Sequence, residues 1–444
     1  MLGKCFLFGI VIDEVVIMKK RILFLIFICQ LSIVNCQLSM ASSILIPMDE
    51  SQKNHLKAYG ITYWVLKQNV TAQWLLNYRG GSFLFPYNQD FEKECTIRGI
   101  SYEVIPDVKV NAILEEIASP EANMDAVKLE KAPKVAVYSP KTKQPWDDAV
   151  TLVLTYAEIP YDLVYDEDVI GNKLVTYDWL HLHHEDFTGQ YGRFWASYKN
   201  ATWYQNEVKE SEATAAKLGF AKVSQLKLAV AKKIRDFVTG GGFLFAMCSA
   251  TDSYDIALAT EGVDICESMF DGDPADPDMN KKIDYSKDFA FRNYTLNSNP
   301  YDYEFANIDT YHTRQPKYGV NEANDLFTLF DFSAKWDPVP TMLCQNHEKV
   351  IKGFWGQTVA FDKTYVKPDV LVLGEAKQFN EVRYCHGDFG KGFWTFYGGH
   401  DPEDYQHQVE DPPTDLALHP NSPGYRLILN NVLFPAAKKK KQKT

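Results

Sequence analysis

A run of glycines followed by a short apolar segment that ends on a cysteine constrains the fold more than any other feature. A helix-like segment at 223–237 leads into the three glycines at 240–242, and an apolar stretch at 243–247 then precedes Cys248. Small residues follow the cysteine, as they do where a buried parallel strand turns sharply into a helix. The pattern therefore predicts a parallel strand that presents the Cys248 thiol at its carboxyl end.

A second apolar run, at 392–397, leads to His400, which Asp401 and Glu403 follow closely. A cysteine with a distant histidine and acid is the pattern of a nucleophile and its base. We therefore expect Cys248 as nucleophile, His400 as base, and Glu403 or Asp401 as the carboxylate that orients the histidine.

The residues after Cys248 are expected to begin a helix, whose first backbone N–H groups carry partial positive charge. Such surroundings favour a thiolate, so we expect the pKa of the Cys248 thiol to be lowered. The backbone N–H of Ser249 is the expected donor to an oxyanion. The alternative is that Cys248 is a small buried apolar residue, which is common for a free cysteine.

Strands and helices alternate from residue 134 onward, which is typical of a parallel sheet with helices on both faces. Ligands of such sheets bind at the carboxyl ends of the strands. The expected strands are 135–138, 161–165, 177–182, 242–247, 370–373, 381–385 and 392–397, and the expected helices are 147–157, 211–237 and 425–433.

Histidines and carboxylates gather at the end of the expected strand 177–182. Strand alternation places His181 and His183 on one face, and the following residues enter a loop at the carboxyl edge. Imidazole and carboxylate groups suit a metal, but the spacing fits no defined motif, so pocket lining is favoured and neither metal nor cofactor is expected. The residues expected to bind substrate are Ser249, His183, His184, Glu185, Thr188 and Gly189.

The N-terminal part, residues 42–130, is expected to form a separate α/β domain. Its expected strands are 43–49, two short strands within 74–85, and 101–105; its expected helices are 55–65, 89–98 and 109–117, and 120–131 is expected to be a polar connector. Residues 131–437 would form the second domain, with an insertion at about 260–367 and a basic tail at 438–444. The acidic loop at 271–278 lacks the Gly and Glu of an EF-hand, which favours a solvated loop over a calcium site.

Residues 1–41 resemble a signal peptide, because Lys19, Lys20 and Arg21 precede an apolar stretch at 22–34. Met18 could be the true start. The stretch is too short to predict a membrane span. Asn35 stands where a lipoprotein signal has a small residue before its cysteine, which argues against a lipid anchor. We therefore expect a periplasmic or secreted protein with no stable membrane span.

The net charge of −12 argues against a nucleic-acid binder, which needs a basic face. Beyond the leader five cysteines remain, an odd number without CxxC pairs, so at least one thiol should be free. A small molecule or an envelope component is the expected partner.

The segment from Gly242 to Ala250 and that from Gly390 to Glu403 resemble the class I glutamine amidotransferase-like superfamily, with its PfpI-like and ThuA-like relatives. This resemblance covers about 134–260 and 368–436. It implies a flavodoxin-like sheet with the nucleophile at Cys248 and the base at His400. The whole chain also resembles secreted bacterial proteins named asparagine synthetase B-like.

Two departures from that family pattern bear on catalysis. Active amidotransferases carry Gly-x-Cys-x-Gly, whereas Ala246 and Ala250 flank Cys248 here. They also carry His-Pro-Glu, whereas one additional residue separates His400 from Glu403. The leading hypothesis is therefore an exported Cys-His hydrolase or amidase, with glutamine among its candidate substrates. The alternative is a non-catalytic protein that binds a sugar or peptide and retains the fold.

Overall fold

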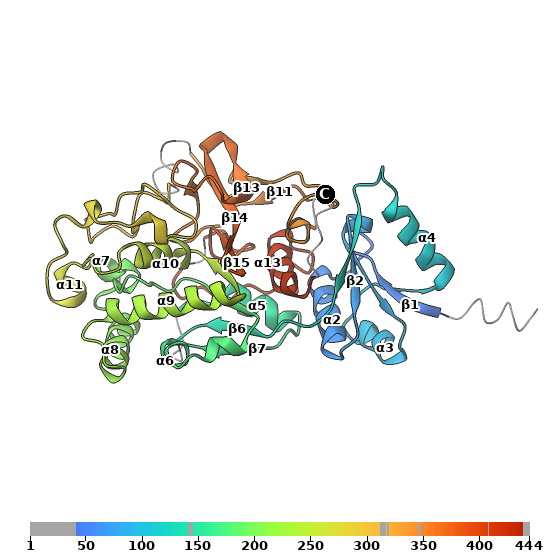
Figure 1. Cartoon of the computed structure of the whole chain (residues 1–444), viewed down its shortest axis with the longest axis horizontal. Coiled ribbons are helices and arrows are strands. Elements are labelled where there is room, and N and C mark those ends of the chain that lie inside the picture. Colours follow the sequence, from blue (N-terminus) through green and yellow to red (C-terminus); the bar gives the residue numbers. More distant parts are fainter. Residues whose placement is uncertain are drawn as a thin grey trace, which may run out of the picture.

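The computed structural model describes residues 41–140, 145–310, 317, 319–344, 348–406 and 408–437. The expected leader, apart from Ala41, and the expected basic tail lie outside this range. The described chain forms two sheets with helices packed against them, which confirms a mixed α/β protein (Figure 1). Within the described ranges, no helix combines the length and apolar character that crossing a membrane requires.

The first sheet is antiparallel throughout, with the strand order β4-β1-β3-β2-β5. One face packs on α4 through a small apolar cluster that includes Leu45, Leu84 and Ile113. The other face packs on α2 and α3. The strands are β1 (Ala41–Ile46), β2 (Ala72–Leu76), β3 (Ser82–Pro86), β4 (Glu103–Pro106) and β5 (Asp125–Leu129); the helices are α2 (His55–Lys67), α3 (Gln89–Ile97) and α4 (Asp107–Ala118).

The expected polar connector at 120–131 is wrong, because it contains the edge strand β5, which pairs with β2. Val127 and Leu129 are buried on the sheet face, while Lys128 between them is exposed. An alternation of only two buried residues in a polar segment is a weak strand signal. Pairing with β2 and burial of the two apolar side chains stabilise the strand.

The second sheet has ten strands and two halves of different character. The strands β7, β6, β8, β9 and β15 are neighbours in that order and run parallel. Beyond β15, the sheet continues antiparallel through β14, β13, β10 and β11, and β12 pairs with β14. Its strands are β6 (Val135–Tyr138), β7 (Tyr161–Val164), β8 (Trp179–Leu182), β9 (Phe243–Met247), β10 (Leu326–Leu329), β11 (Val350–Lys352), β12 (Phe361–Asp362), β13 (Leu371–Ala376), β14 (Glu381–Phe389) and β15 (Gly392–Tyr397).

Helices cover both faces of the parallel half. The helices α5 and α13 belong to the apolar cluster on one face, and α9 and α10 belong to the cluster on the other. The helices of this part are α5 (Ala149–Tyr156), α6 (Asp166–Ile170), α7 (Trp195–Tyr198), α8 (Thr202–Lys217), α9 (Val223–Gly240), α10 (Ser249–Ala259), α11 (Ser268–Asp271) and α13 (Pro423–Leu433). The single helix expected at 211–237 is wrong: residues 218–222 interrupt it and separate α8 from α9.

The expected insertion is built into the second sheet. It contributes β10, β11 and β12 to the antiparallel half, and its buried aromatic residues, such as Phe289 and Phe291, pack in the same cluster as α10. Within the insertion, the residues outside the described ranges are 311–316, 318 and 345–347. The described part of the insertion is thus continuous with the core, and it reaches the carboxyl edge of the parallel strands.

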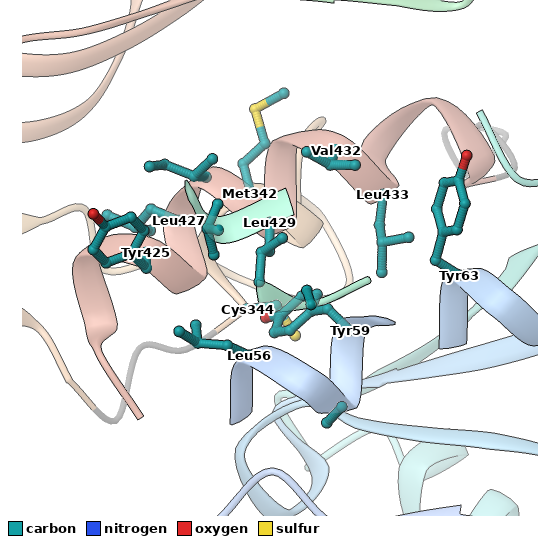
Figure 2. Close-up of a cluster of buried hydrophobic side chains, with 14 of the residues drawn as sticks. Leu56, Tyr59, Tyr63, Met342, Cys344, Tyr425, Leu427, Leu429, Val432 and Leu433 are labelled. Atoms are coloured by element: carbon teal, nitrogen blue, oxygen red, sulfur yellow. The ribbon is translucent and has the colours of Figure 1, made fainter. Parts of the chain in front are cut away.

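The two sheets share one apolar core, which Figure 2 shows between α2 and α13. Leu56, Tyr59 and Tyr63 project from α2 toward Leu429 and Leu433 of α13 (Figure 2). Two polar contacts reinforce this core: the Tyr59 hydroxyl donates to Asn430 Oδ1 at 2.5 Å, and the Tyr63 hydroxyl donates to the Pro133 carbonyl at 2.6 Å.

The contact between α2 and α5 is close enough to require a glycine. A Cβ atom on Gly60 would lie 1.8 Å from the Ala157 carbonyl oxygen. Two backbones therefore meet at this point, and the first part of the chain is packed against the second through α2.

Candidate functional site

Cys248 occupies the sharp turn between β9 and α10, as the sequence predicts. Its backbone has φ 50° and ψ −140°, and it is the N-cap residue of α10. A non-glycine residue in such a conformation costs about 1–3 kcal/mol, and this strain is concentrated at functional sites. Because β9 lies between β8 and β15, the turn follows an interior strand of the parallel half of the sheet.

The surroundings of the Cys248 thiol differ from the expected thiolate site. Burial raises the pKa of the thiol to about 11, although the backbone N–H groups of Thr358, Gln357 and Ser249 act in the opposite direction. The expectation of a lowered pKa is therefore wrong, because removal of the sulfur from water outweighs the N–H groups at the helix start. The resting form is a neutral thiol, so a base must remove its proton before any attack.

A segment of the insertion lies directly over Cys248; we call residues 353–358 the strap. The Gln357 N–H donates to Cys248 Sγ at 3.2 Å. A Cβ atom on Gly356 would stand 3.0 Å from the same sulfur and 3.3 Å from Gly399. The strap thus fills the space between the cysteine and the residue before His400.

Three further hydrogen bonds hold the strap in place. The Gln357 Nε2 group donates to the carbonyls of Gly192 at 2.9 Å and Tyr303 at 2.7 Å. The backbone N–H of His400 donates to the Trp355 carbonyl at 2.7 Å. The Cys248 thiol is therefore covered from the solvent side, and a substrate can reach it only if the strap moves.

Three histidine rings meet at the carboxyl ends of β8 and β15. The centroids of the His183 and His400 rings are 4.0 Å apart, and those of His183 and His184 are 4.5 Å apart. Each of the three offers a ring nitrogen within 4.8 Å of the other two. The Trp146 indole N–H donates to His184 Nε2. His183, His184 and His400 are thus one cluster, although the sequence separates His400 from the others by more than two hundred residues.

The cluster is tied to the cysteine turn by backbone contacts. The Ala250 N–H donates to the His183 carbonyl at 3.4 Å, and the Ser249 hydroxyl donates to the His184 carbonyl at 2.9 Å. The helix that begins after Cys248 therefore contacts the loop that carries the histidines. Ser249 contacts this loop through its side chain.

A partly buried acid that the sequence did not single out, Asp148, contacts His181 and His183. Its Oδ1 atom accepts from the N–H groups of Val150 and Thr151 and so caps α5. Its Oδ2 atom lies 3.3 Å from His181 Nε2 and 3.5 Å from His183 Nδ1. Burial by itself raises the pKa of Asp148, but the charges and hydrogen bonds of His181 and His183 outweigh burial and hold the pKa well below its usual value.

The two acids expected to orient His400 contact other groups. Asp401 Oδ1 accepts from the Glu403 N–H at 2.9 Å, and Asp401 Oδ2 accepts from the Thr414 hydroxyl at 2.8 Å. Glu403 lies 3.1 Å from His419 Nδ1. Asp401 is fully buried and organises the turn after His400, whereas the carboxylate that contacts a ring nitrogen of His183 is Asp148.

Glu185, Thr188 and Gly189 lie in the loop after β8. Burial, followed by the charge of Asp148, raises the pKa of Glu185 to about 8. The hydroxyl of Thr188 donates to Asp186 at 2.6 Å. Gly189 has φ 83° and packs so closely on α9 that a Cβ would lie 2.6 Å from Ser224. Glu185 and Gly189, with His184 and Trp146, line one small cavity of about 40 Å³.

A cavity of this size holds one to a few water molecules, and ligand pockets are typically about 300–1,000 Å³. The larger cavity, of about 500 Å³, lies at the opposite edge of the sheet and includes the glycines at 240–242. The residues near Cys248 therefore form a closed site in the described structure.

Two further expectations from the sequence concern the acidic loop at 271–278 and the free cysteines. Lys222 Nζ lies 2.7 Å from Asp264, 3.0 Å from Asp271 and 2.5 Å from Asp273, so a lysine supplies the countercharge at the start of the acidic loop. The five cysteines in the described ranges, including Cys248, are all free and buried.

Asp148, Trp146 and Gln357 are the site residues that sequence reasoning missed. Asp148 directly precedes the apolar helix α5, so the sequence indicates only an N-cap role for it. Its contacts with His181 and His183 cannot be inferred from that position. One feature of the sequence did point to Asp148: it lies in the loop after β6, the first parallel strand. The carboxyl ends of β6 and β8 lie at the same edge of the sheet, where ligands bind. Gln357 had no signal, because it reaches the site from the insertion.

Comparison with known proteins identifies no family. No protein-family model matches the chain, and no curated protein matches it. Solved structures with some similarity include the cytoplasmic proteins STM3548 and STM1381 from Salmonella typhimurium, each 11% identical and covering 69% of this chain and 100% of that chain, with TM-scores of 0.33 and 0.30. Gan42B, a GH42 beta-galactosidase, is 12% identical, covers 61% of this chain and 28% of that chain, and has a TM-score of 0.24. TM-scores this low establish neither fold family nor function.

The chemistry available at the site follows from the contacts of this chain alone. A thiol on a strained turn lies beside backbone N–H groups, and three imidazoles and one charged carboxylate converge on the neighbouring strand ends. Imidazole can accept a thiol proton, and N–H groups can stabilise an oxyanion. Imidazole and carboxylate groups are also metal ligands.

Proposed function

We propose that this chain is an exported Cys-His hydrolase or amidase related to the class I glutamine amidotransferase-like superfamily. The observation that carries the proposal is the backbone of Cys248, whose φ of 50° and ψ of −140° hold a thiol at the turn between a central strand and a helix. A strained turn of this kind exposes a nucleophile above the sheet edge in strand-turn-helix hydrolases. The charged and apolar stretch at 19–34 supports export.

The order of the parallel strands supports a flavodoxin-like domain. Numbered along the chain from β6, the order β7-β6-β8-β9-β15 is 2-1-3-4-5. That is the flavodoxin-like order, in which ligands bind at the carboxyl ends of the strands. Cys248 and His400 follow the two neighbouring strands β9 and β15 in this order.

In the proposed reaction, movement of the strap admits an amide to Cys248. His400 takes the thiol proton while the sulfur attacks the amide carbonyl carbon, and backbone N–H groups near the sulfur, including that of Ser249, stabilise the oxyanion. The protonated histidine then donates to the leaving nitrogen, which departs as ammonia or an amine. Water hydrolyses the resulting thioester and regenerates the thiol. The resting pKa of about 11 makes the base essential.

Asp148 supports the base through His183 in this proposal. It approaches His183 Nδ1 at 3.5 Å, and the His183 ring in turn packs on the His400 ring. A negative charge behind this pair favours the imidazolium that forms when the thiol is deprotonated. This role replaces the one that the sequence assigns to Asp401 or Glu403.

A second candidate is a non-catalytic protein that binds a sugar or peptide and retains the fold. The observation that favours it is the burial of the Cys248 thiol, which is 1% exposed and covered by the strap. A buried thiol with a raised pKa behaves as a small apolar residue.

The deciding experiment measures amide hydrolysis by the purified chain against a panel containing glutamine, asparagine and amidated cell-wall peptides. Ammonia release is followed in the wild type, Cys248→Ala, His400→Gln and the double variant. We expect each single variant to lose at least about 1,000-fold in rate and the double variant to lose no more, because residues that act as one unit are non-additive. Cys385→Ala is the matched control, since this cysteine is also buried in the second sheet.

Acid quenching followed by intact mass spectrometry should trap an acyl group on wild-type Cys248. Turnover that persists in Cys248→Ala contradicts the proposal. A different outcome would support the second candidate, a non-catalytic binding protein. In that case no amide is hydrolysed, but a sugar or peptide raises the melting temperature of both the wild type and Cys248→Ala.

A further inference from the structure

A buried group of metal-ligating side chains adjoins the proposed hydrolase site and shares Asp148 and His183 with it. Asp148, His181 and His183 each offer one ligand atom, and these atoms lie within 4.8 Å of one another. The side chains of His181 and His183 are 0% and 1% exposed, and that of Asp148 is 15% exposed. We propose that Asp148, His181 and His183 bind one divalent transition-metal ion of the zinc class.

The contacts of His181 point to this ligand. Its Nδ1 atom lies 3.1 Å from the carbonyl oxygen of Phe245, which can only accept a hydrogen bond. Nδ1 must therefore carry the proton, and a neutral ring then directs the Nε2 lone pair at the Asp148 carboxylate. Two lone pairs facing each other in a buried site require a cation between them, either a proton or a metal ion.

The distances favour a metal ion over a proton. Charge-assisted N–H···O hydrogen bonds are about 2.7–2.9 Å long. The separations here are 3.3 Å from Asp148 Oδ2 to His181 Nε2 and 3.5 Å from Oδ2 to His183 Nδ1. Ligand atoms about 2.0–2.1 Å from a tetrahedral zinc ion lie about 3.3 Å from each other. The three ligand atoms also lie within 4.8 Å of one another, as ligands of one ion do.

The groups around these side chains are those that metal ligands need. The Phe245 carbonyl fixes the His181 ring with Nε2 toward the site. The N–H groups of Val150 and Thr151 hold Asp148 Oδ1 and leave Oδ2 directed at the histidines. Such outer contacts orient ligands and contribute about 10–100-fold to metal affinity.

The neighbouring group of His183, His184 and His400 is the weaker choice for the same ion. The Trp146 indole N–H donates to His184 Nε2, so this nitrogen is already engaged as an acceptor. An ion at Asp148, His181 and His183 instead leaves His400 unligated. While the ion is bound, the charge of Asp148 is neutralised and no longer supports a His400 imidazolium. The ion would fix the His183 ring, which packs against His400 at a centroid distance of 4.0 Å.

The test measures zinc binding by the full chain, purified without a histidine tag and treated with a chelator. Isothermal titration with Zn²⁺ alone should give one site per chain with a dissociation constant at or below about micromolar. Co²⁺ should give the intense visible absorption of a tetrahedral site. Metal content after expression in zinc-supplemented medium, measured by plasma mass spectrometry, should approach one zinc per chain.

Asp148→Asn is the sharpest variant, because asparagine is as good an N-cap as aspartate and so keeps α5 capped. It should weaken zinc binding at least about 100-fold, and His181→Gln should do the same. His386→Gln is the matched control, since His386 is also buried in this sheet but contacts Thr395. Circular dichroism checks that each variant is folded.

Cys248→Ala and His184→Gln should bind zinc as the wild type does, so that this inference and the proposed hydrolase can fail separately. The inference is overturned if the wild type binds no stoichiometric zinc, which would leave a proton between Asp148 and His181. It is also overturned if Asp148→Asn binds within tenfold of the wild type, or if His184→Gln abolishes binding, which would move the ion to the other group.

Discussion

The strap over Cys248 gives a prediction whose size can be worked out from its contacts. Gln357→Ala removes the side-chain amide that donates to the carbonyls of Gly192 at 2.9 Å and Tyr303 at 2.7 Å. The variant retains the backbone N–H that donates to Cys248 Sγ. It therefore loosens the strap while keeping the backbone groups that meet the sulfur directly.

The two lost hydrogen bonds contribute about 0.5–1.5 kcal/mol each, or about 1–3 kcal/mol together. If the thiol reacts only when the strap opens, the reaction rate follows the open population. A change of 1–3 kcal/mol then raises the rate about 5- to 150-fold at 25 °C. Opening also hydrates the sulfur of Cys248, whose buried pKa of about 11 leaves only ~0.1% thiolate at pH 8.

The assay is iodoacetamide alkylation at pH 8, with each cysteine quantified by peptide mass spectrometry. Wild-type Cys248 should react slowly, and its rate should rise about tenfold per pH unit between pH 7 and 10, because the reactive form is the thiolate. Gln357→Ala should react about 5- to 150-fold faster at this cysteine alone. Cys385 is the internal reference, and Lys352→Ala, an exposed residue just before the strap, is the control variant.

An unchanged Cys248 rate in Gln357→Ala would refute the role of the strap. An equal rise at Cys385 would show general loosening of the fold instead. A wild-type rate that is already maximal at neutral pH would show that burial does not dominate the thiol pKa and that a thiolate–imidazolium pair exists at rest.

Three further predictions concern stability. Lys227→Met should lower the free energy of unfolding by about 3–5 kcal/mol in urea titrations, because it strips the buried Asp166 of the ammonium 3.0 Å away; the double variant with Asp166→Leu should recover part of this loss. Burial raises the pKa of Glu207 from 4.5 to about 7, so the stability contributed by the neutral carboxyl is complete below pH 4.5 and is lost as the pH rises through 7. Glu207→Gln should remove up to about 3 kcal/mol of this pH dependence, and an unchanged slope would contradict the shift. Cys248→Gly should be more stable than Cys248→Ala by about 1 kcal/mol, because only glycine accepts φ 50° with ψ −140° without strain.

The parallel half of the second sheet could be predicted well from the sequence. Its strands are short apolar runs bounded by glycines or helices, and β6 and β15 have the bounds that the sequence predicts. Burial on both faces produces a continuous apolar run, which is a strong local signal. For the same reason, the Cys248 turn was placed correctly from the residues around it.

The antiparallel half could not be predicted in the same way. β10 and β11 each expose alternate side chains and pair with segments that are distant in the sequence. Such strands are stabilised mainly by the strands they pair with, so their positions cannot be predicted from local composition alone. The contacts of Asp148 with His181 and His183 were missed for a similar reason, because each residue has an adequate local role and the contact exists only when β6 and β8 are neighbours.

The incorrect expectation about the thiol pKa shows which effect dominates at this turn. The sequence predicts helix-start N–H groups beside Cys248, and that of Ser249 does lower the pKa, together with those of Thr358 and Gln357 from the strap. It contains no sign that the insertion returns over the turn and removes the sulfur from water. The N–H groups of a helix start stabilise a nearby anion by about 0.3–2 kcal/mol, which is about one pKa unit. Full burial raises the pKa of an acid by several units, so burial dominates.

Burial and backbone strain at Cys248 have opposite implications for function. A residue kept only to fill space would favour glycine or a relaxed backbone here, because the observed φ and ψ cost a non-glycine residue about 1–3 kcal/mol. The surrounding contacts maintain this cost: Ser249 and Ala250 are bound to the carbonyls of His184 and His183, so the turn cannot relax without breaking the histidine loop. The turn that carries the thiol is therefore held by the loop that carries His183 and His184. In the proposed reaction the raised pKa keeps the cysteine inert while the strap is closed, and opening would return water to the sulfur so that the proposed base can take its proton.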